Sequence, residues 1–343
     1  MALLSVRDLE VKFKTRRATV HAVRGISFDL DAGQTLGIVG ESGCGKSVSS
    51  LAMLGILAKN GRVAGGEVLF DGQDLLKLSD ARLRAIRGKD VAMIFQDPMT
   101  SLNPVLKIGR QLTEVLTKHM AMDKDAAEKE AAELLGRVGI PRAADRLGDY
   151  PHQFSGGMRQ RVMIAMAIAC HPKVLIADEP TTALDVTIQA QILDLLKRLV
   201  EEERMGLILI THDLGVVAGI CERTNVMYAG RFVETAPTPE LFSRPRHPYT
   251  LGLLKSVPRL DAVRKEKLDP IGGVPPELTY VVPGCSFAPR CAYATDKSRE
   301  VTPELRAIDT EGHLVACWNP VPDADLPSTP GPPAQPDDRW AAR

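Results

Sequence analysis

A glycine-rich octapeptide has the residue types and spacing of a phosphate-binding loop: Gly40-Glu41-Ser42-Gly43-Cys44-Gly45-Lys46-Ser47. It matches G-x-x-x-x-G-K-[ST], in which glycines let successive backbone N–H groups approach phosphate oxygens. Lys46 is predicted to reach the β and γ phosphates of a nucleotide, and the Ser47 hydroxyl to ligate Mg²⁺. A chance glycine-rich turn is the alternative, and eight matching positions argue against it. We interpret Cys44 as a small space-filling residue of the loop.

Two carboxylates, Asp178 and Glu179, follow the apolar run Val174–Ala177. An aspartate at the end of such a strand suits direct or indirect Mg²⁺ coordination, and the next carboxylate can polarise an attacking water. An acidic strand end that merely feeds a loop is the alternative. The phosphate loop in the same chain makes that alternative the less favoured one.

A second glycine-rich segment, Ser155-Gly156-Gly157, stands at the start of an apolar helix. Exposed N–H groups and a hydroxyl at a helix N-terminus form an anion-binding nest. The simpler interpretation is an N-cap, with Ser155 as the capping residue. One chain seldom needs two such nests for one nucleotide, so the second one suggests a nucleotide held by another subunit.

These segments must be positioned by an alternation of strands and helices, which predicts an α/β fold with a largely parallel sheet. The strands expected from apolar runs are 35–39, 66–70, 174–177 and 207–211, and the helices beside them are 48–57 and 187–203. Helical spacing over 108–119 and 124–138 predicts an all-helical insert at about 100–165.

The composition excludes several classes of protein. The 343 residues carry 43 Lys+Arg and 43 Asp+Glu, so the basic footprint of a nucleic-acid-binding protein is absent. The longest apolar runs, 51–58 and 162–170, are shorter than the roughly 18–20 residues that span a bilayer. The first residues do not follow the pattern of a signal peptide, so we expect a cytoplasmic protein with reduced thiols.

Six motifs in order give the chain its resemblance to the ATP-binding cassette (ABC) ATPases. After the phosphate loop come Gln96 in Phe95-Gln-Asp-Pro98, the Ser155-Gly-Gly signature, Asp178-Glu179, the Thr182-Ala-Leu-Asp185 loop and His212 in Ile210-Thr-His-Asp213. The resemblance implies a P-loop NTPase cassette over residues 1–245. Such a cassette has a RecA-like parallel-sheet core, an antiparallel β subdomain and a helical subdomain at about 100–165.

The same resemblance implies a role for each matching residue. The loop and Gln96 would bind ATP and Mg²⁺, and Asp178 would support the metal. Glu179 would be the general base, and His212 would contact the γ-phosphate. The signature would contact the partner's ATP, and Asp185 would communicate across a dimer. Phe13 is the candidate for stacking on adenine, with His21 as the weaker one; a core phenylalanine on an early strand is an equally fair interpretation. The signature reads Phe-Ser-Gly-Gly-Met where Leu-Ser-Gly-Gly-Gln is commonest, and its Ser-Gly-Gly is intact.

Residues 246–320 resemble the C-terminal extension of the dipeptide/oligopeptide importer ATPases, a branch that includes nickel and glutathione importers. The resemblance lies in the stretches 239–254 and 256–260 and in Gly284-Cys-Ser-Phe-Ala-Pro-Arg-Cys-Ala-Tyr-Ala-Thr-Asp-Lys297. We expect residues 321–343, which are rich in proline, to form a disordered tail.

Some members of this branch hold a [4Fe–4S] cluster on four cysteines of the extension. Here Cys285, Cys291 and Cys317 match, whereas Ser298 stands where the third ligand aligns. Thiolate is the preferred ligand of iron in such clusters. Three reduced structural cysteines are therefore slightly favoured over a cluster.

The combined interpretation is the ATP-hydrolysing subunit of a peptide importer, bound to the cytoplasmic face of the inner membrane. The resemblance implies three kinds of partner: a second ATPase subunit, expected to be a paralogue, two transmembrane permeases, and an extracytoplasmic binding protein reached through them; no nucleic acid is expected. Nickel, glutathione or another small solute is the alternative substrate. An ABC ATPase of DNA repair or translation and a P-loop kinase are the rival classes, and the single cassette with its Ser-Gly-Gly signature argues against them.

Overall fold

The protein was analysed as a computed structural model that describes residues 2–182, 184–256, 271–280 and 283–327. The chain divides into two compact units. Unit 1 comprises Met1–Ser5, Asp29–Gln34 and Leu69–Ile210, and unit 2 comprises Val6–Phe28, Thr35–Val68 and Thr211–Arg343. Each unit is described by itself below.

The sheet of unit 1 is parallel and deeply buried. Strand β7 (Val174–Asp178) pairs on one side with β6 (Val91–Ile94) and on the other with β8 (Gly206–Thr211). Every residue of β7 and β8 is buried. Near-continuous apolar strands of this kind belong to sheets covered on both faces, as the sequence predicts. Helix α8 (Val186–Glu203) follows β7.

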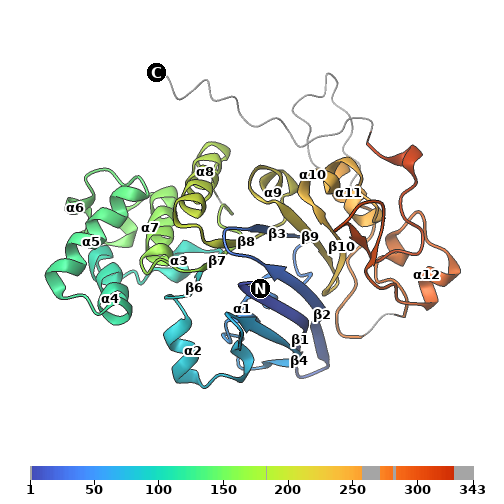
Figure 1. The fold of residues 1–343 in the computed structure, drawn as a ribbon, viewed down its shortest axis with the longest axis horizontal. Coiled ribbons are helices and arrows are strands. Elements are labelled where there is room, and N and C mark those ends of the chain that lie inside the picture. Colours follow the sequence, from blue (N-terminus) through green and yellow to red (C-terminus); the bar gives the residue numbers. More distant parts are fainter. Residues whose placement is uncertain (1, 183, 257–270, 281–282, 328–343) are drawn as a thin grey trace. The chain divides into compact units, whose positions relative to one another are not determined.

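The predicted helical insert is present in unit 1 (Figure 1). It contains α3 (Pro98–Ser101), α4 (Ile108–Met120), α5 (Lys124–Arg137), α6 (Ala143–Arg146) and α7 (Gly156–Ile168). Helices α4 and α5 pack on each other and on α7. Leu112 and Leu116 from α4 and Leu134 from α5 are fully buried. Helix α2 (Asp80–Ile86) precedes β6.

In unit 2, β3 (Thr35–Val39) runs parallel to β9 (Arg223–Tyr228), and β9 is antiparallel to β10 (Arg231–Pro237). Helix α1 (Lys46–Met53) follows β3, and α9 (Leu214–Ile220) precedes β9. Two short strands from the end of the chain, β12 (Leu314–Val315) and β11 (Arg306–Ala307), continue the sheet beyond β10. The C-terminal extension is therefore joined to the cassette by backbone hydrogen bonds.

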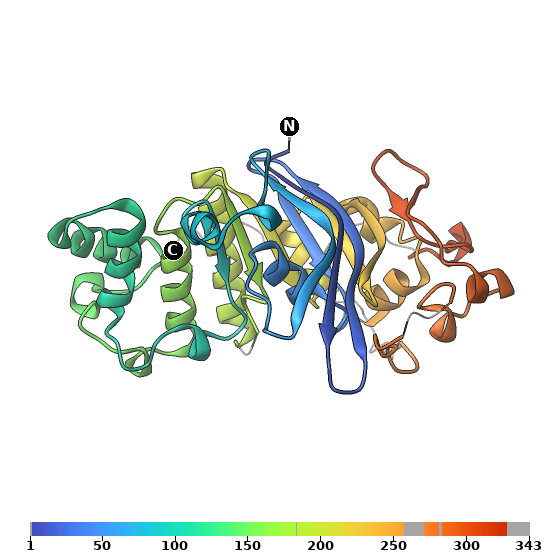
Figure 2. The same ribbon diagram turned by 90° about the horizontal axis from the view of Figure 1, so that it is seen from below.

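A second sheet has the strand order β2-β1-β4-β5. Its strands are β1 (Leu4–Lys14), β2 (Thr19–Leu30), β4 (Gly61–Phe70) and β5 (Gln73–Asp74). Figure 2 shows β1 and β2 as a long hairpin. The Thr15 hydroxyl donates to the Ala18 carbonyl at 2.7 Å and so fixes the turn between them.

In unit 2, α10 (Thr238–Ser243) follows β10, and the extension contains α11 (Pro248–Ser256) and α12 (Asp296–Glu300). The described residues also form short 3₁₀ helices, η1 (Leu75–Lys77), η2 (Pro151–Gln153), η3 (Ala288–Arg290) and η4 (Asp323–Asp325). Val321 is 1 % exposed and its N–H donates to the Arg246 carbonyl, so packed structure reaches beyond residue 320. Residues 328–343 of the predicted disordered tail lie outside the described residues.

Across the described ranges, no helix has both the length and the hydropathy that crossing a membrane requires.

Candidate functional site

The phosphate loop of unit 2 has the backbone that its glycines predict. It follows β3 and leads into α1, with φ of +79° at Gly43 and +110° at Gly45. A β-carbon at Gly45 would collide with the Ala22 carbonyl oxygen, and one at Gly40 with the Met227 carbonyl oxygen. Any residue with a side chain would therefore have to displace backbone at these two positions. The result is a bare N–H-lined loop at a helix N-terminus, which suits a polyphosphate.

Lys46 lies across this loop. Its Nζ donates to the carbonyl oxygens of Gly40 at 2.7 Å and Glu41 at 3.1 Å, and the residue is only 4 % exposed. The cation is thus held against the loop without occupying the N–H groups that would face a ligand. Cys44 is 6 % exposed, and burial raises the pKa of its thiol. A protonated, buried thiol agrees with the space-filling role expected of it.

In unit 1, Gln96 and Thr182 both contact the carboxylate of Glu179. Glu179 Oε2 accepts hydrogen bonds from Gln96 Nε2 at 2.9 Å and from the Thr182 hydroxyl at 2.8 Å. Glu179 has φ of +46°, and its N–H donates to the Ile210 carbonyl at 2.8 Å. Strained backbone of this kind is concentrated at functional sites. Asp178 precedes it at the buried end of β7 and is 5 % exposed.

The Ser155-Gly156-Gly157 segment opens the 13-residue helix α7. The Ser155 hydroxyl accepts from the Met158 N–H at 3.3 Å, so the N-cap role is present. A β-carbon at Gly157 would lie 2.7 Å from Ile188 of α8, which explains a glycine there by close packing. Asp185 caps α8 in the same way by accepting from the Ile188 N–H at 2.9 Å. The roles of these residues toward a partner stay predictions.

The remaining predicted contacts lie in unit 2. His212 is exposed and directly follows β8. Phe13 is half-buried on β1, and its ring packs on the backbone of Gly61 in β4. That packing supports the interpretation of Phe13 as a strand-packing residue, and adenine stacking stays a prediction. The His21 N–H donates to the Leu278 carbonyl at 2.8 Å.

The three cysteines of the extension do not fit a four-thiolate cluster. The Ser298 hydroxyl, where the third ligand aligns, accepts from Asn319 Nδ2 at 3.0 Å and from the Thr295 N–H at 3.2 Å, and Ser298 is buried. Burial raises the pKa of the Cys285 and Cys291 thiols, and raises that of Cys317 to about 12. No group of three or more His, Cys, Asp or Glu residues within the described ranges is arranged to hold a metal ion.

Two residues that sequence reasoning missed contact the phosphate loop. The Glu41 N–H donates to the Tyr249 hydroxyl at 2.8 Å, and Arg290 forms a bidentate ion pair with the Glu41 carboxylate at 2.7 and 3.0 Å. Hydrogen bonding to Glu41 raises the pKa of Arg290. The available signal was a carboxylate inside an anion-binding loop, which requires a nearby cation.

Two family models match the chain. Residues 23–182 match the model described as ABC transporter, and residues 233–297 match that described as oligopeptide/dipeptide transporter, C-terminal region. The dipeptide transport ATP-binding protein DppD of Bacillus subtilis is 54 % identical over 92 % of this chain and 94 % of its own length. The oligopeptide transport ATP-binding protein OppD of Haemophilus influenzae is 53 % identical over 92 % of this chain and 97 % of its own length.

The chain belongs to the ATP-binding proteins of the dipeptide/oligopeptide ABC transporter family. The predicted family and its ATPase class are therefore confirmed. The C-terminal match also accounts for the residues that follow the cassette in this family member.

Solved structures confirm the predicted fold class of this ABC family member. A dimeric ATP-binding cassette in a post-hydrolysis state with ADP and Pi superposes with a TM-score of 0.62 at 28 % identity, covering 68 % of this chain and 98 % of that one. The cbiO1 cassette of Clostridium perfringens superposes with a TM-score of 0.59 at 29 % identity, covering 70 % of this chain and 90 % of that one.

Proposed function

We propose that this chain is the ATP-hydrolysing subunit that powers the import of di- and oligopeptides. The observation that carries the substrate class is the oligopeptide/dipeptide transporter region at 233–297, which belongs to the same unit as the phosphate loop. The cassette alone indicates ATP hydrolysis and does not identify the transported substrate. Relatives named for dipeptide and oligopeptide transport cover more than nine tenths of the chain.

The nucleotide site consists of the phosphate loop, Lys46 and Ser47, which would hold ATP–Mg²⁺. Bound ATP–Mg²⁺ supplies the scissile phosphoanhydride and the cation that neutralises its charge. Gln96 donates its amide N–H to Glu179, which orients the amide oxygen as a hard ligand suited to Mg²⁺. Phe13 is the proposed adenine contact, and His212 the proposed γ-phosphate contact.

Glu179 acts as the general base for the attacking water. Its carboxylate is oriented by the Gln96 amide and the Thr182 hydroxyl, both on Oε2. Two donors on one oxygen fix the orientation of the carboxylate, so Glu179 can accept a proton from water without a change of rotamer. The Asp178 carboxylate supports the cation from the preceding position.

Two cassettes form the functional dimer, in which Ser155, Gly156 and Gly157 of one chain contact the ATP of the other. A dimeric cassette with ADP and Pi is among the solved structures that resemble this fold. ATP binds the closed dimer more tightly and shifts the population toward it, Asp185 links the two sites, and hydrolysis releases the dimer. The second cassette is a paralogue, two permeases span the membrane, and this chain lies at the cytoplasmic face. A binding protein delivers the substrate to the permeases.

The base is tested by Glu179→Gln in the complex assembled with its membrane subunits. Turnover is expected to fall by about 100-fold or more, as for loss of general-base catalysis, while the Kd for ATP stays within about threefold. Glu128→Gln on the exposed surface of α5 is the matched control. Retained hydrolysis in Glu179→Gln would disprove the assignment of the base.

The cargo is tested by uptake of a labelled dipeptide into cells that express the chain with its membrane subunits. Uptake is expected with the parent chain and not with Glu179→Gln. Uptake of nickel or glutathione in place of the peptide would assign the alternative substrate class and leave the ATPase role intact. Association with ribosomes or DNA in place of membrane subunits would overturn the transport role.

A further inference from the structure

Two side chains of the C-terminal extension contact the phosphate loop, and all the groups involved lie in unit 2. Tyr249 is in the first turn of α11, and Arg290 ends η3. Between them they bind two of the three polar groups of Glu41: the N–H goes to the Tyr249 hydroxyl and the carboxylate to Arg290. The third, the Glu41 carbonyl, accepts from Lys46. One loop residue is thus fixed at every polar group.

Arg290 uses all five of its N–H donors. Besides the two bonds to Glu41, Nη1 donates to the Tyr228 hydroxyl at 3.2 Å, Nε to the Gly272 carbonyl at 2.8 Å, and Nη2 to the Ile271 carbonyl at 3.2 Å. A guanidinium has five donors in a rigid fork, so its position here is fully determined. The side chain is only 4 % exposed.

An aromatic cluster surrounds this contact. The ring of Tyr228 lies 4.6 Å from that of Tyr249 and 5.3 Å from that of Phe287, and Tyr249 lies 5.4 Å from Phe287. The Arg290 guanidinium carbon is 5.8 Å from the centres of both the Tyr228 and the Phe287 rings. The Arg290–Glu41 pair is therefore packed against rigid, water-excluding groups, which strengthens its electrostatic interaction.

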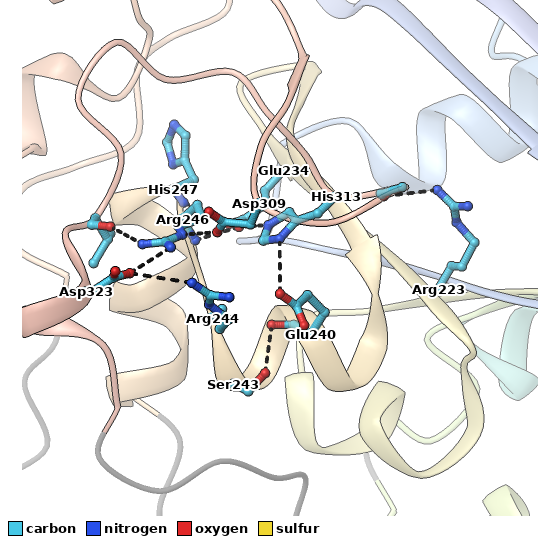
Figure 3. Close-up of polar contacts among 12 residues, drawn as sticks. Arg223, Glu234, Glu240, Ser243, Arg244, Arg246, His247, Asp309, His313 and Asp323 are labelled. Carbon is cyan, nitrogen blue, oxygen red and sulfur yellow. Dashed lines mark hydrogen bonds and ion pairs between the residues drawn. The ribbon is translucent and has the colours of Figure 1, made fainter.

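The extension that carries these groups is fastened to β10 by a buried carboxylate (Figure 3). Glu234 is fully buried and accepts from the N–H of Arg246 at 2.6 Å, the N–H of His247 at 2.9 Å and Nε2 of His313 at 2.8 Å. A buried carboxylate is tolerated only with several such partners. These bonds fix the residues directly before α11, and hence the position of Tyr249.

Arg246 extends the same anchor to the end of the described chain. Its guanidinium pairs with Asp309, with Asp323 at 2.7 Å and with the Val321 carbonyl at 2.8 Å. Figure 3 shows dashed lines from Arg246 to both Asp309 and Asp323. The extension is thus connected to the sheet independently of its contact with the phosphate loop.

Glu41 poses an electrostatic problem in a loop that is built to bind phosphate. An unpaired carboxylate there would repel the nucleotide and would be free to leave its position. Arg290 pairs with the negative charge of Glu41, and the Tyr249 hydroxyl binds the backbone N–H of Glu41. We propose that Arg290 is a positioning residue of the nucleotide site, through which the C-terminal extension neutralises Glu41 and keeps the phosphate loop open for ATP.

This proposal rests on the proposed nucleotide site, and it assigns to the extension a role inside that site. Its consequence is specific: the damage caused by losing Arg290 comes from the negative charge left on Glu41. Removing that charge should therefore repair the damage. A residue that only stabilises the fold gives no such rescue.

The test measures the Kd of a fluorescent ATP analogue with Mg²⁺ on the full chain. Arg290→Ala is expected to raise this Kd by about tenfold or more, because it leaves a partly buried carboxylate unpaired. The double variant Glu41→Gln with Arg290→Ala is expected to return to within about threefold of the parent. Arg290→Lys keeps the charge but not the fork, and should lie between the two.

Arg299→Ala, an exposed arginine of the same extension, is the matched control and should leave the Kd unchanged. Thermal unfolding of each variant verifies that it is folded at the assay temperature; if Arg290→Ala is not, Arg290→Lys and its double variant with Glu41→Gln replace it. A Kd within about twofold of the parent in the single variant, or no recovery in the double variant, would overturn the proposal. Failure of the parent chain itself to bind the analogue would instead disprove the proposed nucleotide site.

Discussion

The chain has two glycine-rich segments at helix N-termini, and they are built differently. The phosphate loop contains a buried lysine, two glycines with positive φ and a carboxylate paired to an arginine of the extension. The Ser155-Gly156-Gly157 segment has a single side-chain cap, and its serine is exposed. The phosphate loop is complete within its own unit, whereas the second segment offers N–H groups and a hydroxyl without a lysine.

That difference indicates different ligand relationships. A loop in which Glu41 is held at each of its polar groups before the ligand arrives loses little conformational freedom on binding. The Ser155-Gly156-Gly157 segment offers only N–H groups and one hydroxyl. Its affinity for a nucleotide would therefore depend on the groups that a second molecule holds around that nucleotide. Variants at the two segments test this contrast.

Lys46→Ala should remove nucleotide binding by the isolated chain. The buried ammonium is the cation that the loop contributes to the phosphates, so a rise of about 100-fold or more in the Kd for ATP is expected, or about 2.7 kcal/mol. Equilibrium titration with a fluorescent ATP analogue measures it. Lys118→Ala, on the exposed surface of α4, should leave the Kd unchanged. Binding by Lys46→Ala with parent affinity would show that nucleotide is held elsewhere.

Gly45→Ala and Gly156→Ala form a matched pair. The first places a β-carbon against the Ala22 carbonyl at φ of +110° and should cost more than about 2 kcal/mol of folding free energy. The second brings a β-carbon to 3.7 Å from Leu184, an ordinary contact, and should change stability by less than about 0.5 kcal/mol. Urea unfolding compares the two. Equal costs would contradict the stronger steric constraint at Gly45 than at Gly156.

Stability should fall in acid through His247, at the start of the extension. Burial lowers the pKa of this histidine to about 3, and its Nδ1 accepts from the Tyr249 N–H. Below the unfolded pKa of about 6.5, the unfolded chain takes up a proton that the native chain does not, so stability is lost as pH falls from about 6.5 toward 3, by up to about 1.4 kcal/mol per pH unit. His247→Gln should show a shallower loss in urea unfolding over this range. Parallel curves for the two chains would exclude His247 as the cause.

Ser155→Ala should have the smallest effect on the isolated chain. Loss of the cap is expected to cost about 1 kcal/mol of stability, and the Kd for ATP should stay within about twofold. Turnover in the assembled transporter should nevertheless collapse if the signature serves the partner's nucleotide. A large rise in the Kd of the isolated chain would place the signature on its own nucleotide instead.

The sequence predicted what depends on local patterns. The phosphate loop, the buried strands and the helical insert follow from glycine spacing, apolar runs and helical periodicity, and each was found. Boundaries moved where glycines act: Gly55, with φ of +62°, follows the end of α1 where helix was predicted to 57. Strand β4 starts at Gly61, five residues before the predicted start at 66.

Contacts between distant segments could not be predicted in this way. The pairing of Glu41 with Arg290 joins residues 249 positions apart, and no periodicity reports such a meeting. The Pro-Arg-Cys stretch was used for the family resemblance and for its cysteine, and no role was predicted for Arg290. The packing of Phe13 on Gly61 was likewise one of two open interpretations, because a sequence shows an aromatic residue without its neighbour.

The distance along the chain between Glu41 and its two partners, Tyr249 and Arg290, also determines when they are synthesised. During synthesis, Tyr249 follows Glu41 by 208 residues and Arg290 by 249. At about 5–20 residues per second, the ribosome adds Arg290 about 12 to 50 seconds after the loop residue it will pair with. Until Tyr249 has been made the growing chain carries a phosphate loop with neither partner, and until Arg290 has been made it lacks the arginine. With the proposed role of Arg290, nucleotide binding with full affinity begins only after Arg290 has been made.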